Sequence, residues 1–166
     1  MNKLEQMITQ IEQLNEVAGQ KASDYLDTLT KPPGSLGRLE ELAIQLAGIT
    51  GVLPLELMRK AIIVMAGDHG VCEEGVSAFP QEVTPQMVMN FLHGGAAINV
   101  LARQAGADVI CVDIGVRSDL EHEDLYHRKV RRGTNNITRG AAMSRDEAVL
   151  AITHGIEMVE ELVGKG

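Results

Sequence analysis

AIIVMAGDHGVCEEGVSAFPQEVTPQ, residues 61–86, is the stretch of sequence that decides the fold. Its first six residues are all apolar. This run is too short for a free-standing helix and stops at a glycine, so we expect a buried β-strand over residues 61–66. The strand passes directly into Gly67-Asp68-His69-Gly70 and then into a loop rich in small and acidic residues. Open parallel sheets bind ligands outside the carboxyl ends of their strands. The stretch therefore predicts a site at this strand end.

The residues that follow predict a second parallel strand and the helices that lead to it. Thr84 is placed to cap a helix that begins at Pro85, and a further helix is expected over residues 96–105. The sequence DVICVDIGV at residues 108–116 is again apolar and predicts a second buried strand. This strand–helix–strand spacing is typical of a right-handed crossover between parallel strands.

The residues after the second predicted strand give weaker indications of secondary structure. Residues 126–131 predict a further strand, at an edge of the sheet, and residues 133–140 form a polar loop. Ser144 and Glu147 have the spacing of a capping box, which opens a last helix.

The first 54 residues predict helices. Apolar residues at helical spacing indicate a helix over residues 4–18, stopped by Gly19, and a short second helix over residues 22–29. Pro32-Pro33 cannot continue a helix, and Ser35 is a candidate N-cap for a helix over residues 36–48.

These patterns together predict an α/β fold. We expect a three-layer α/β/α arrangement with a mainly parallel, Rossmann-like sheet, preceded by an N-terminal helical segment. The expected division is a helical subdomain at residues 1–54 and the first part of an α/β domain, apparently truncated, at residues 55–166.

Composition excludes some classes of function. The formal net charge of −8 argues against a nucleic-acid-binding protein, and the one basic cluster, residues 127–132, is either a solvated strand edge or an anion contact. No window approaches the roughly 20 apolar residues of a membrane span, and no signal peptide is recognisable. The cysteines, Cys72 and Cys111, fit free thiols. The expectation is a soluble, cytoplasmic protein without nucleic-acid or membrane partners.

Three groups of residues in the deciding stretch are candidates for chemistry. Asp68 and His69 could transfer protons or bind a ligand, or could only shape the loop; no metal site is expected, because no second histidine or Cys/His cluster lies at ligand spacing. Glu73-Glu74 is expected to be a solvated acidic turn. Residues 77–82 combine a hydroxyl, Phe79, an amide and a carboxylate, a mixture that suits a flat heteroaromatic ligand or a rigid turn.

Several longer motifs resemble one enzyme family. They are KPPGSLGRLE at residues 31–40, AGDHGV at 66–71, EGVSAFPQEVT at 74–84, GGAAIN at 94–99, VDIGV at 112–116 and GTNN at 133–136. In this order they resemble the nicotinate-nucleotide–dimethylbenzimidazole phosphoribosyltransferases of cobalamin synthesis, and the resemblance covers nearly the whole chain.

The resemblance implies an activity and a set of substrate-binding residues. The family moves the phosphoribosyl group of nicotinate mononucleotide to 5,6-dimethylbenzimidazole, giving α-ribazole 5′-phosphate and nicotinate, without a metal or organic cofactor. It implies that Phe79, Pro80, Val83, Gln86 and Met87 lie at or near the benzimidazole. Some relatives carry Ser in place of Phe79 and Gln in place of Met87. By contrast, Asp68, His69, Gly70 and Ser35 are interpreted as residues that shape the loops near the site.

The catalytic residue itself is expected elsewhere. In the family, the catalytic glutamate and the glycine-rich phosphate-binding segments lie in the carboxyl-terminal half, so the base is expected beyond Gly166. We therefore expect no catalytic residue in this chain and no turnover by it alone. The alternatives are a non-catalytic benzimidazole-binding fragment and a dimerisation unit; the family resemblance implies a homodimer.

Overall fold

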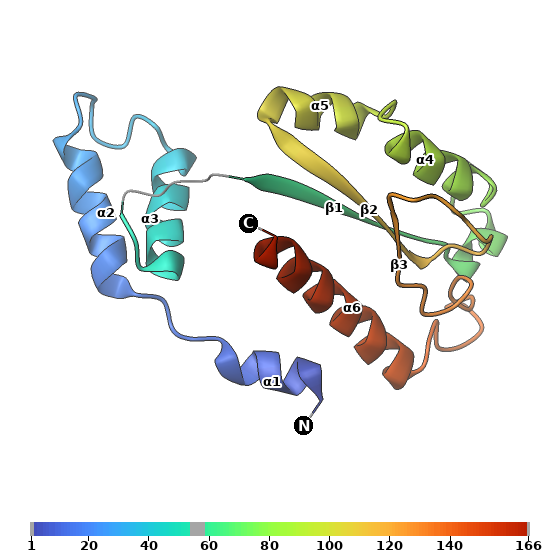
Figure 1. Ribbon diagram of the computed structural model, residues 1–166. Helices are drawn as coiled ribbons and strands as arrows, with labels where there is room; N and C mark the ends of the chain where they lie inside the picture. Colours follow the sequence, from blue (N-terminus) through green and yellow to red (C-terminus); the bar gives the residue numbers. More distant parts are fainter. Residues whose placement is uncertain (1, 54–58, 166) are drawn as a thin grey trace. The chain divides into compact units, whose positions relative to one another are not determined.

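The structure, a computed structural model, describes residues 2–53 and 59–165 of the chain (Figure 1). These residues belong to two compact units. One unit comprises Met7–Met58, and the other comprises Met1–Gln6 together with Arg59–Gly166. The expected domain boundary between residues 54 and 55 lies outside the described residues.

The smaller unit is built on two packed helices, α2 (Glu16–Thr28) and α3 (Arg38–Thr50). The buried residues of both helices are small: Ala18, Gly19, Ala22, Ala47 and Gly48. Small side chains allow two helix backbones to approach closely. A Cβ atom added at Gly19 would lie 3.7 Å from the Ile44 side chain. Gly19 is therefore a packing position inside α2, and its predicted role as a helix stop is wrong.

The single helix predicted over residues 4–18 is interrupted. Helix α1 covers Lys3–Gln10, and α2 begins at Glu16 and absorbs the short helix predicted over residues 22–29. The reason for the break is Asn15, whose side-chain oxygen accepts a hydrogen bond at 2.9 Å from the Ala18 amide. This N-cap satisfies an amide that has no partner within the helix, and so favours a new start.

The predicted N-cap at Ser35 is also wrong, because α3 begins at Arg38 after Gly37. Ser35 instead lies in the preceding turn, where its amide donates to the Pro32 carbonyl at 3.1 Å. The two ends of the motif at residues 31–40 are joined by an ion pair of 2.9 Å between Lys31 and Glu40. The Leu36 amide donates to the same Glu40 carboxylate at 3.0 Å. The hydrogen bond from Lys31 holds the pKa of Glu40 below its usual value.

The described residues of the larger unit form a parallel sheet of three strands in the order β1-β2-β3. The strands are β1 (Lys60–Gly67), β2 (Ala107–Gly115) and β3 (Leu125–His127). Ile63 of β1 is in register with Ile110 of β2, and Cys111 of β2 with Leu125 of β3. The prediction of two parallel strands joined by a crossover is confirmed. The third strand is shorter than predicted.

Helices pack against the sheet. After β1 come the 3₁₀ helix η1 (Gly70–Glu74), α4 (Val83–Leu92) and α5 (Ala97–Ala105), and α4 contributes Val88 to a buried cluster with Cys111, Val116 and Leu125. Helix α6 (Arg145–Gly164) lies across the sheet from α4 and α5 in Figure 1. A Cβ atom added at Gly155 of α6 would lie 3.9 Å from the Met65 side chain of β1.

Two further local predictions have opposite outcomes. The capping box is confirmed: the Ser144 side chain accepts from the Glu147 amide at 3.2 Å, and the Glu147 carboxylate accepts from the Ser144 amide at 2.7 Å. The cap at Thr84 is wrong, because α4 begins at Val83. The Val83 and Thr84 amides donate to the carbonyls of Pro80 and Gln81, so the preceding turn already supplies their acceptors.

The strand β1 is less buried than predicted. Its residues are half-buried or exposed, and Met65 is 40% exposed, whereas Cys111, Val112 and Asp113 in the middle of β2 are buried. The cause is the position of the strands in the sheet: among the described residues, β2 is flanked by two strands and β1 by one.

Within the described residues, none of the helices has both the length and the apolar character that a membrane span requires.

A cavity at the carboxyl end of β1

Asp68 ties the end of β1 to the end of β2. Its buried carboxylate accepts a hydrogen bond at 2.8 Å from the backbone amide of Arg117, the second residue after β2. Its own amide donates to the Gly115 carbonyl at 3.0 Å, and its carbonyl accepts from the Thr134 amide at 2.9 Å. Asp68 therefore joins three segments at the edge of the sheet, and its carboxylate is engaged in doing so.

Gly70 allows the loop after Asp68 to lie directly on the loop at residues 133–136. A Cβ atom added at Gly70 would come within 2.6 Å of backbone atoms of Thr134, Asn135 and Asn136. The Gly70 amide also donates to the Thr134 hydroxyl at 3.2 Å. Because backbone atoms cannot move aside as a flexible side chain can, this contact requires glycine.

Glu74 holds the same two loops together from the other end of η1. Its carboxylate accepts hydrogen bonds from the Asn136 amide group at 2.6 Å and the Thr138 hydroxyl at 3.2 Å, and it lies 3.3 Å from the Arg139 guanidinium. The hydrogen bond from Asn136, supported by Thr138 and Arg139, lowers the pKa of Glu74 below its usual value. Glu74 is thus a hydrogen-bonded part of the loop structure, and it remains exposed, as predicted for a solvated acidic turn.

These contacts frame a cavity of about 350 Å³ beside the carboxyl end of β1. Part of its lining comes from β1, through Val64 and Ala66, and part from the 77–82 turn and from α4. Phe79 of the turn and Val83, Met87 and Phe91 of α4 supply apolar side chains. An apolar cavity with a few oriented polar groups is the usual form of a small-molecule site.

The structure places the predicted substrate-binding residues as follows. Phe79, Pro80, Val83 and Met87 all line this cavity; Gln86 does not and is exposed on α4. The turn that presents Phe79 is held by the Ser77 hydroxyl, which donates to the Phe79 carbonyl at 2.8 Å and accepts from its amide at 3.2 Å. Phe79 itself is 70% exposed, so much of its ring is available for contact.

The predicted loop-shaping residues are divided between the two units. Asp68 and His69 line the cavity, and Gly70 lies behind it against the 133–136 loop. The His69 carbonyl accepts a hydrogen bond at 2.8 Å from the Gln81 side chain, which joins η1 to the turn that carries Phe79. Ser35 belongs to the other unit. The roles assigned to these residues remain predictions.

A second cavity, of about 240 Å³, lies on the α6 side of the same strand end and shares Asp68 and His69 with the first. It is lined by Arg131 and by Glu147 of α6, whose side chains form an ion pair of 3.3 Å. The backbone amide of Ser144, and to a lesser degree Arg131, lowers the pKa of Glu147. The two cavities place Asp68 and His69 between them at the end of β1.

The basic cluster at residues 127–132 makes ion pairs with acidic residues of the same unit. Lys129 lies 3.2 Å from the buried carboxylate of Asp113, Arg128 lies 3.4 Å from Glu161, and Arg132 lies 2.7 Å from Asp119. These contacts neutralise the cluster locally and favour its structural interpretation over an anion contact.

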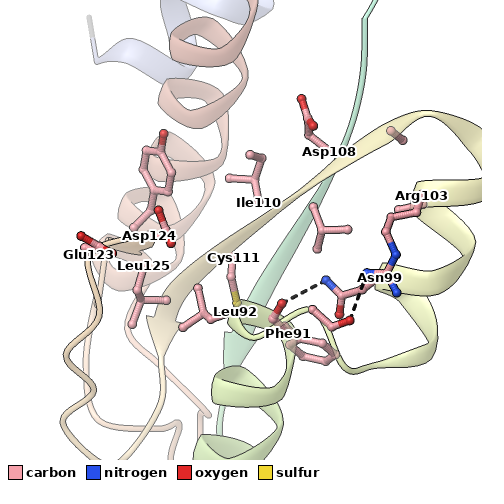
Figure 2. Close-up of a pocket in the computed structure, with 15 residues that line it drawn as sticks. Phe91, Leu92, Asn99, Arg103, Asp108, Ile110, Cys111, Glu123, Asp124 and Leu125 are labelled. Carbon is pink, nitrogen blue, oxygen red and sulfur yellow. Dashed lines mark hydrogen bonds between the residues drawn. The ribbon is translucent and has the colours of Figure 1, made fainter.

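A larger cavity, of about 560 Å³, lies away from this strand end (Figure 2). Two of its polar side chains donate to nearby backbone carbonyls: Asn99 to that of Phe91 at 3.0 Å and Arg103 to that of Gly94 at 3.1 Å. The acidic residues Asp108, Glu123 and Asp124 also line it. Cys111 lies in its lining, and burial raises the pKa of that thiol. Because four of the predicted substrate-binding residues, Phe79, Pro80, Val83 and Met87, line the β1 cavity and none lines this one, the β1 cavity is the better candidate site.

Among the residues that the structure describes, no group of three His, Cys, Asp or Glu side chains could hold a metal ion.

Comparisons with known proteins agree with the motifs. Residues 11–166 match a family described as "Phosphoribosyltransferase". The nicotinate-nucleotide–dimethylbenzimidazole phosphoribosyltransferase of Chloroflexus aggregans is 56% identical over 167 residues, which cover 100% of this chain and 47% of that protein. The enzyme of the same name from Halalkalibacterium halodurans is 51% identical, over 100% of this chain and 46% of that protein.

Solved structures give the same result. The crystal structure of CobT from Thermus thermophilus has a TM-score of 0.84 and 48% identity, over 90% of this chain and 45% of that one. A second Thermus thermophilus structure, of the nicotinate-nucleotide–dimethylbenzimidazole phosphoribosyltransferase, has a TM-score of 0.85 and 47% identity, over 92% of this chain and 47% of that one. The chain spans about half the length of the curated relatives it matches and corresponds to an amino-terminal portion of them. It belongs to the nicotinate-nucleotide–dimethylbenzimidazole phosphoribosyltransferase family.

Proposed function

We propose that this chain supplies the benzimidazole-binding wall of an enzyme that transfers the phosphoribosyl group of nicotinate mononucleotide to 5,6-dimethylbenzimidazole. The products are α-ribazole 5′-phosphate and nicotinate. The observation that carries the proposal is the apolar cavity at the carboxyl end of β1, which Phe79, Val83 and Met87 all line. Its volume of about 350 Å³ is near the lower end of ligand pockets, as suits a ligand of two fused rings.

The reaction requires this wall mainly to bind the benzimidazole and to orient its ring. One ring nitrogen of the benzimidazole attacks the anomeric carbon of the ribose as the bond to nicotinate breaks, with inversion, and a base takes the proton from the other nitrogen. Holding the two substrates in line lowers the entropic part of the barrier. Phe79, Val83 and Met87 would exclude water from the ring faces, and the turn at residues 77–82 would set the orientation of the ring.

We assign no catalytic base within this chain. Asp68 carries the one carboxylate among the described residues that line the cavity, and its Oδ2 atom already accepts from the Arg117 amide. We therefore interpret Asp68, with His69 and Gly70, as a residue that shapes the loop. In this proposal the catalytic glutamate lies in the carboxyl-terminal half of the family's enzymes. This chain alone should therefore give no turnover.

The wider architecture belongs to the same proposal. We infer a three-layer, Rossmann-like α/β domain, supported by a parallel sheet with α4 and α5 packed on one face and α6 across from them. The proposed enzyme is a homodimer that works in the cytoplasm.

The test is an assay on a fused chain. Residues 1–166 would be joined to the part of the Chloroflexus aggregans enzyme that lies beyond its matched region, and α-ribazole 5′-phosphate would be measured. Because a lost aromatic contact weakens binding by about 1.4 kcal/mol or more, Phe79→Ala should raise KM for dimethylbenzimidazole about tenfold. KM for nicotinate mononucleotide should stay unchanged.

Val76→Ala is the matched control, since Val76 is exposed in the same loop and lies outside the cavity lining. A folded fusion without product would contradict the proposed activity. Equal KM values for the Phe79 variant and the control would contradict the proposed wall.

A further inference from the structure

The turn at residues 77–82, which carries Phe79, is shaped by short-range hydrogen bonds. The Ser77 hydroxyl bonds to both the amide and the carbonyl of Phe79, and two carbonyls of the turn accept from the first amides of α4. These bonds join residues that are neighbours in the sequence. They do not by themselves fix the position of the turn relative to the end of β1.

The Gln81 side chain makes the connection between the turn and the end of β1. Its Nε2 atom donates to the backbone carbonyl of His69 at 2.8 Å, across 12 positions in the sequence. Within the described part of the chain, it is the one hydrogen bond between residues 77–82 and residues 60–76. Gln81 and His69 both line the β1 cavity, so this bond lies at the candidate site.

The chemistry of the two groups fixes the orientation of the Gln81 amide. A carbonyl oxygen can only accept a hydrogen bond, so the nitrogen end of the amide must face His69. The His69 backbone follows directly on Asp68, whose amide and carboxylate are both hydrogen-bonded at the end of β2. Gln81 therefore ties the turn to a firmly held point of the sheet.

We propose that Gln81 is a positioning residue for the aromatic base: it holds the turn at the strand end and thereby sets the place of the Phe79 ring. Phe79 is 70% exposed, so the position of its ring depends on the turn that carries it. A contact group that is already in place loses less conformational entropy when the ligand binds. The inference rests on the proposed function and deepens it, since it names the residue on which the Phe79 contact depends.

The test uses the fused chain of the preceding section and measures KM for both substrates. Gln81→Met keeps the length of the side chain and removes its donor, so KM for dimethylbenzimidazole should rise about fivefold. KM for nicotinate mononucleotide should stay unchanged, whereas a general loss of structure would change both values. Gln81→Lys returns a donor on a side chain of similar length and should bring KM back to within about twofold of the original value.

A double substitution shows whether Gln81 acts through Phe79. In a chain that already carries Phe79→Ala, Gln81→Met should raise KM for dimethylbenzimidazole by less than about twofold, because the ring that it positions is gone. The same fivefold rise in both backgrounds would contradict the inference. Gln104→Met is the matched control, since Gln104 is exposed on α5 and lies outside the cavity lining. It should leave both KM values unchanged.

The possible outcomes separate this inference from the proposed function. If the unmodified fusion forms product and Phe79→Ala raises KM, the proposed function stands. An unchanged KM for Gln81→Met then overturns the inference alone. A folded fusion that forms no product overturns the proposed activity, and this inference with it.

Amide hydrogen exchange tests the contact in the unfused chain without any substrate. In Gln81→Met, exchange of the peptide at residues 77–82 should quicken about fivefold, because the turn has lost its bond to the strand end. In Gln104→Met it should not change. Equal exchange in the two variants would overturn the inference whatever the kinetics show.

Discussion

The Asp68 carboxylate and the Arg117 backbone amide are joined by a hydrogen bond of 2.8 Å that links the carboxyl ends of β1 and β2. The two residues are 49 positions apart in the sequence, and the parallel pairing of the strands brings them together. The Asp68 carboxylate is therefore engaged in joining the two strand ends that border the candidate site.

Removing this carboxylate should destabilise the larger unit. A charge-assisted hydrogen bond contributes about 1.5 to 3 kcal/mol, so Asp68→Ala should lower the free energy of unfolding by about 2 kcal/mol. Urea denaturation measures the change. Asp108→Ala is the control, because the Asp108 side chain is exposed and its ion pair with Arg59 is long, at 3.8 Å; its effect should stay within about 0.5 kcal/mol. Equal changes in the free energy of unfolding for the two substitutions would contradict a stabilising contribution from the Asp68 hydrogen bond.

A methyl group at Gly70 should force two loops apart. The added Cβ atom would lie 2.6 Å from backbone atoms at residues 134–136, and overpacking of this kind costs about 1 to 3 kcal/mol. We expect Gly70→Ala to lower the thermal unfolding midpoint. Gly164→Ala, where nothing lies within 4 Å of the added atom, should leave it unchanged or raise it slightly. An unchanged midpoint for Gly70→Ala would contradict the close approach of these loops.

Acid should loosen the contact between η1 and the 133–140 loop. The pKa of Glu74 is lowered in the folded chain, chiefly by the hydrogen bond from Asn136, so its stabilising effect is complete above the unfolded pKa. It is lost as pH falls through the lower folded value, below about pH 4.3. Hydrogen exchange of residues 133–140 should therefore quicken relative to residues 111–113 on acidification, after correction for the intrinsic pH dependence of exchange.

Glu74→Gln supplies the comparison for this pH effect. The amide cannot titrate, so the variant should show the looser contact already at neutral pH and little further change in acid. If the variant keeps the acid response of the unmodified chain, Glu74 is not its source.

The proposed homodimer can be tested at the exposed apolar side chains of the N-terminal region. Ile8 is 59% exposed and Ile11 is 77% exposed, and surfaces of this kind mark interfaces when they are contiguous. If they form the dimer contact, changing both to glutamate should convert a dimer into a monomer in sedimentation equilibrium. The double variant Glu12→Gln and Glu16→Gln is a control in the same region, and should keep its mass. An unchanged mass for the isoleucine variant would place the dimer contact elsewhere.

Local sequence patterns predicted the larger unit better than the smaller one. The apolar runs that became β1 and β2 were identifiable because each is bounded by glycine and charge. The capping box of Ser144 and Glu147 was predictable because its two partners are only three residues apart in the sequence. By contrast, the apolar spacing at residues 4–18 suggested one helix, and the Asn15 cap that divides it looks like any other polar residue in a helical stretch.

The candidate site was predictable only in part. Phe79, Val83 and Met87 were assigned through the family motifs, and their common cavity follows from the turn held by Ser77. The contact of Glu74 with Asn136 was missed, because 62 residues separate them and no local pattern reports such a pairing. The exposure of β1 was missed for a similar reason: an apolar run indicates a strand, but the number of its neighbours depends on the whole sheet.

The central claim, that the wall at the end of β1 binds the benzimidazole, is tested most directly by nuclear magnetic resonance on the chain with labelled valine and methionine methyl groups. Titration with 5,6-dimethylbenzimidazole should shift the methyl signals of Val83 and Met87, which line the cavity, and leave that of Val159 on α6 unchanged. Phe79→Ala should weaken the response. Shifts confined to other methyl groups, or no shifts at saturating ligand, would contradict the account.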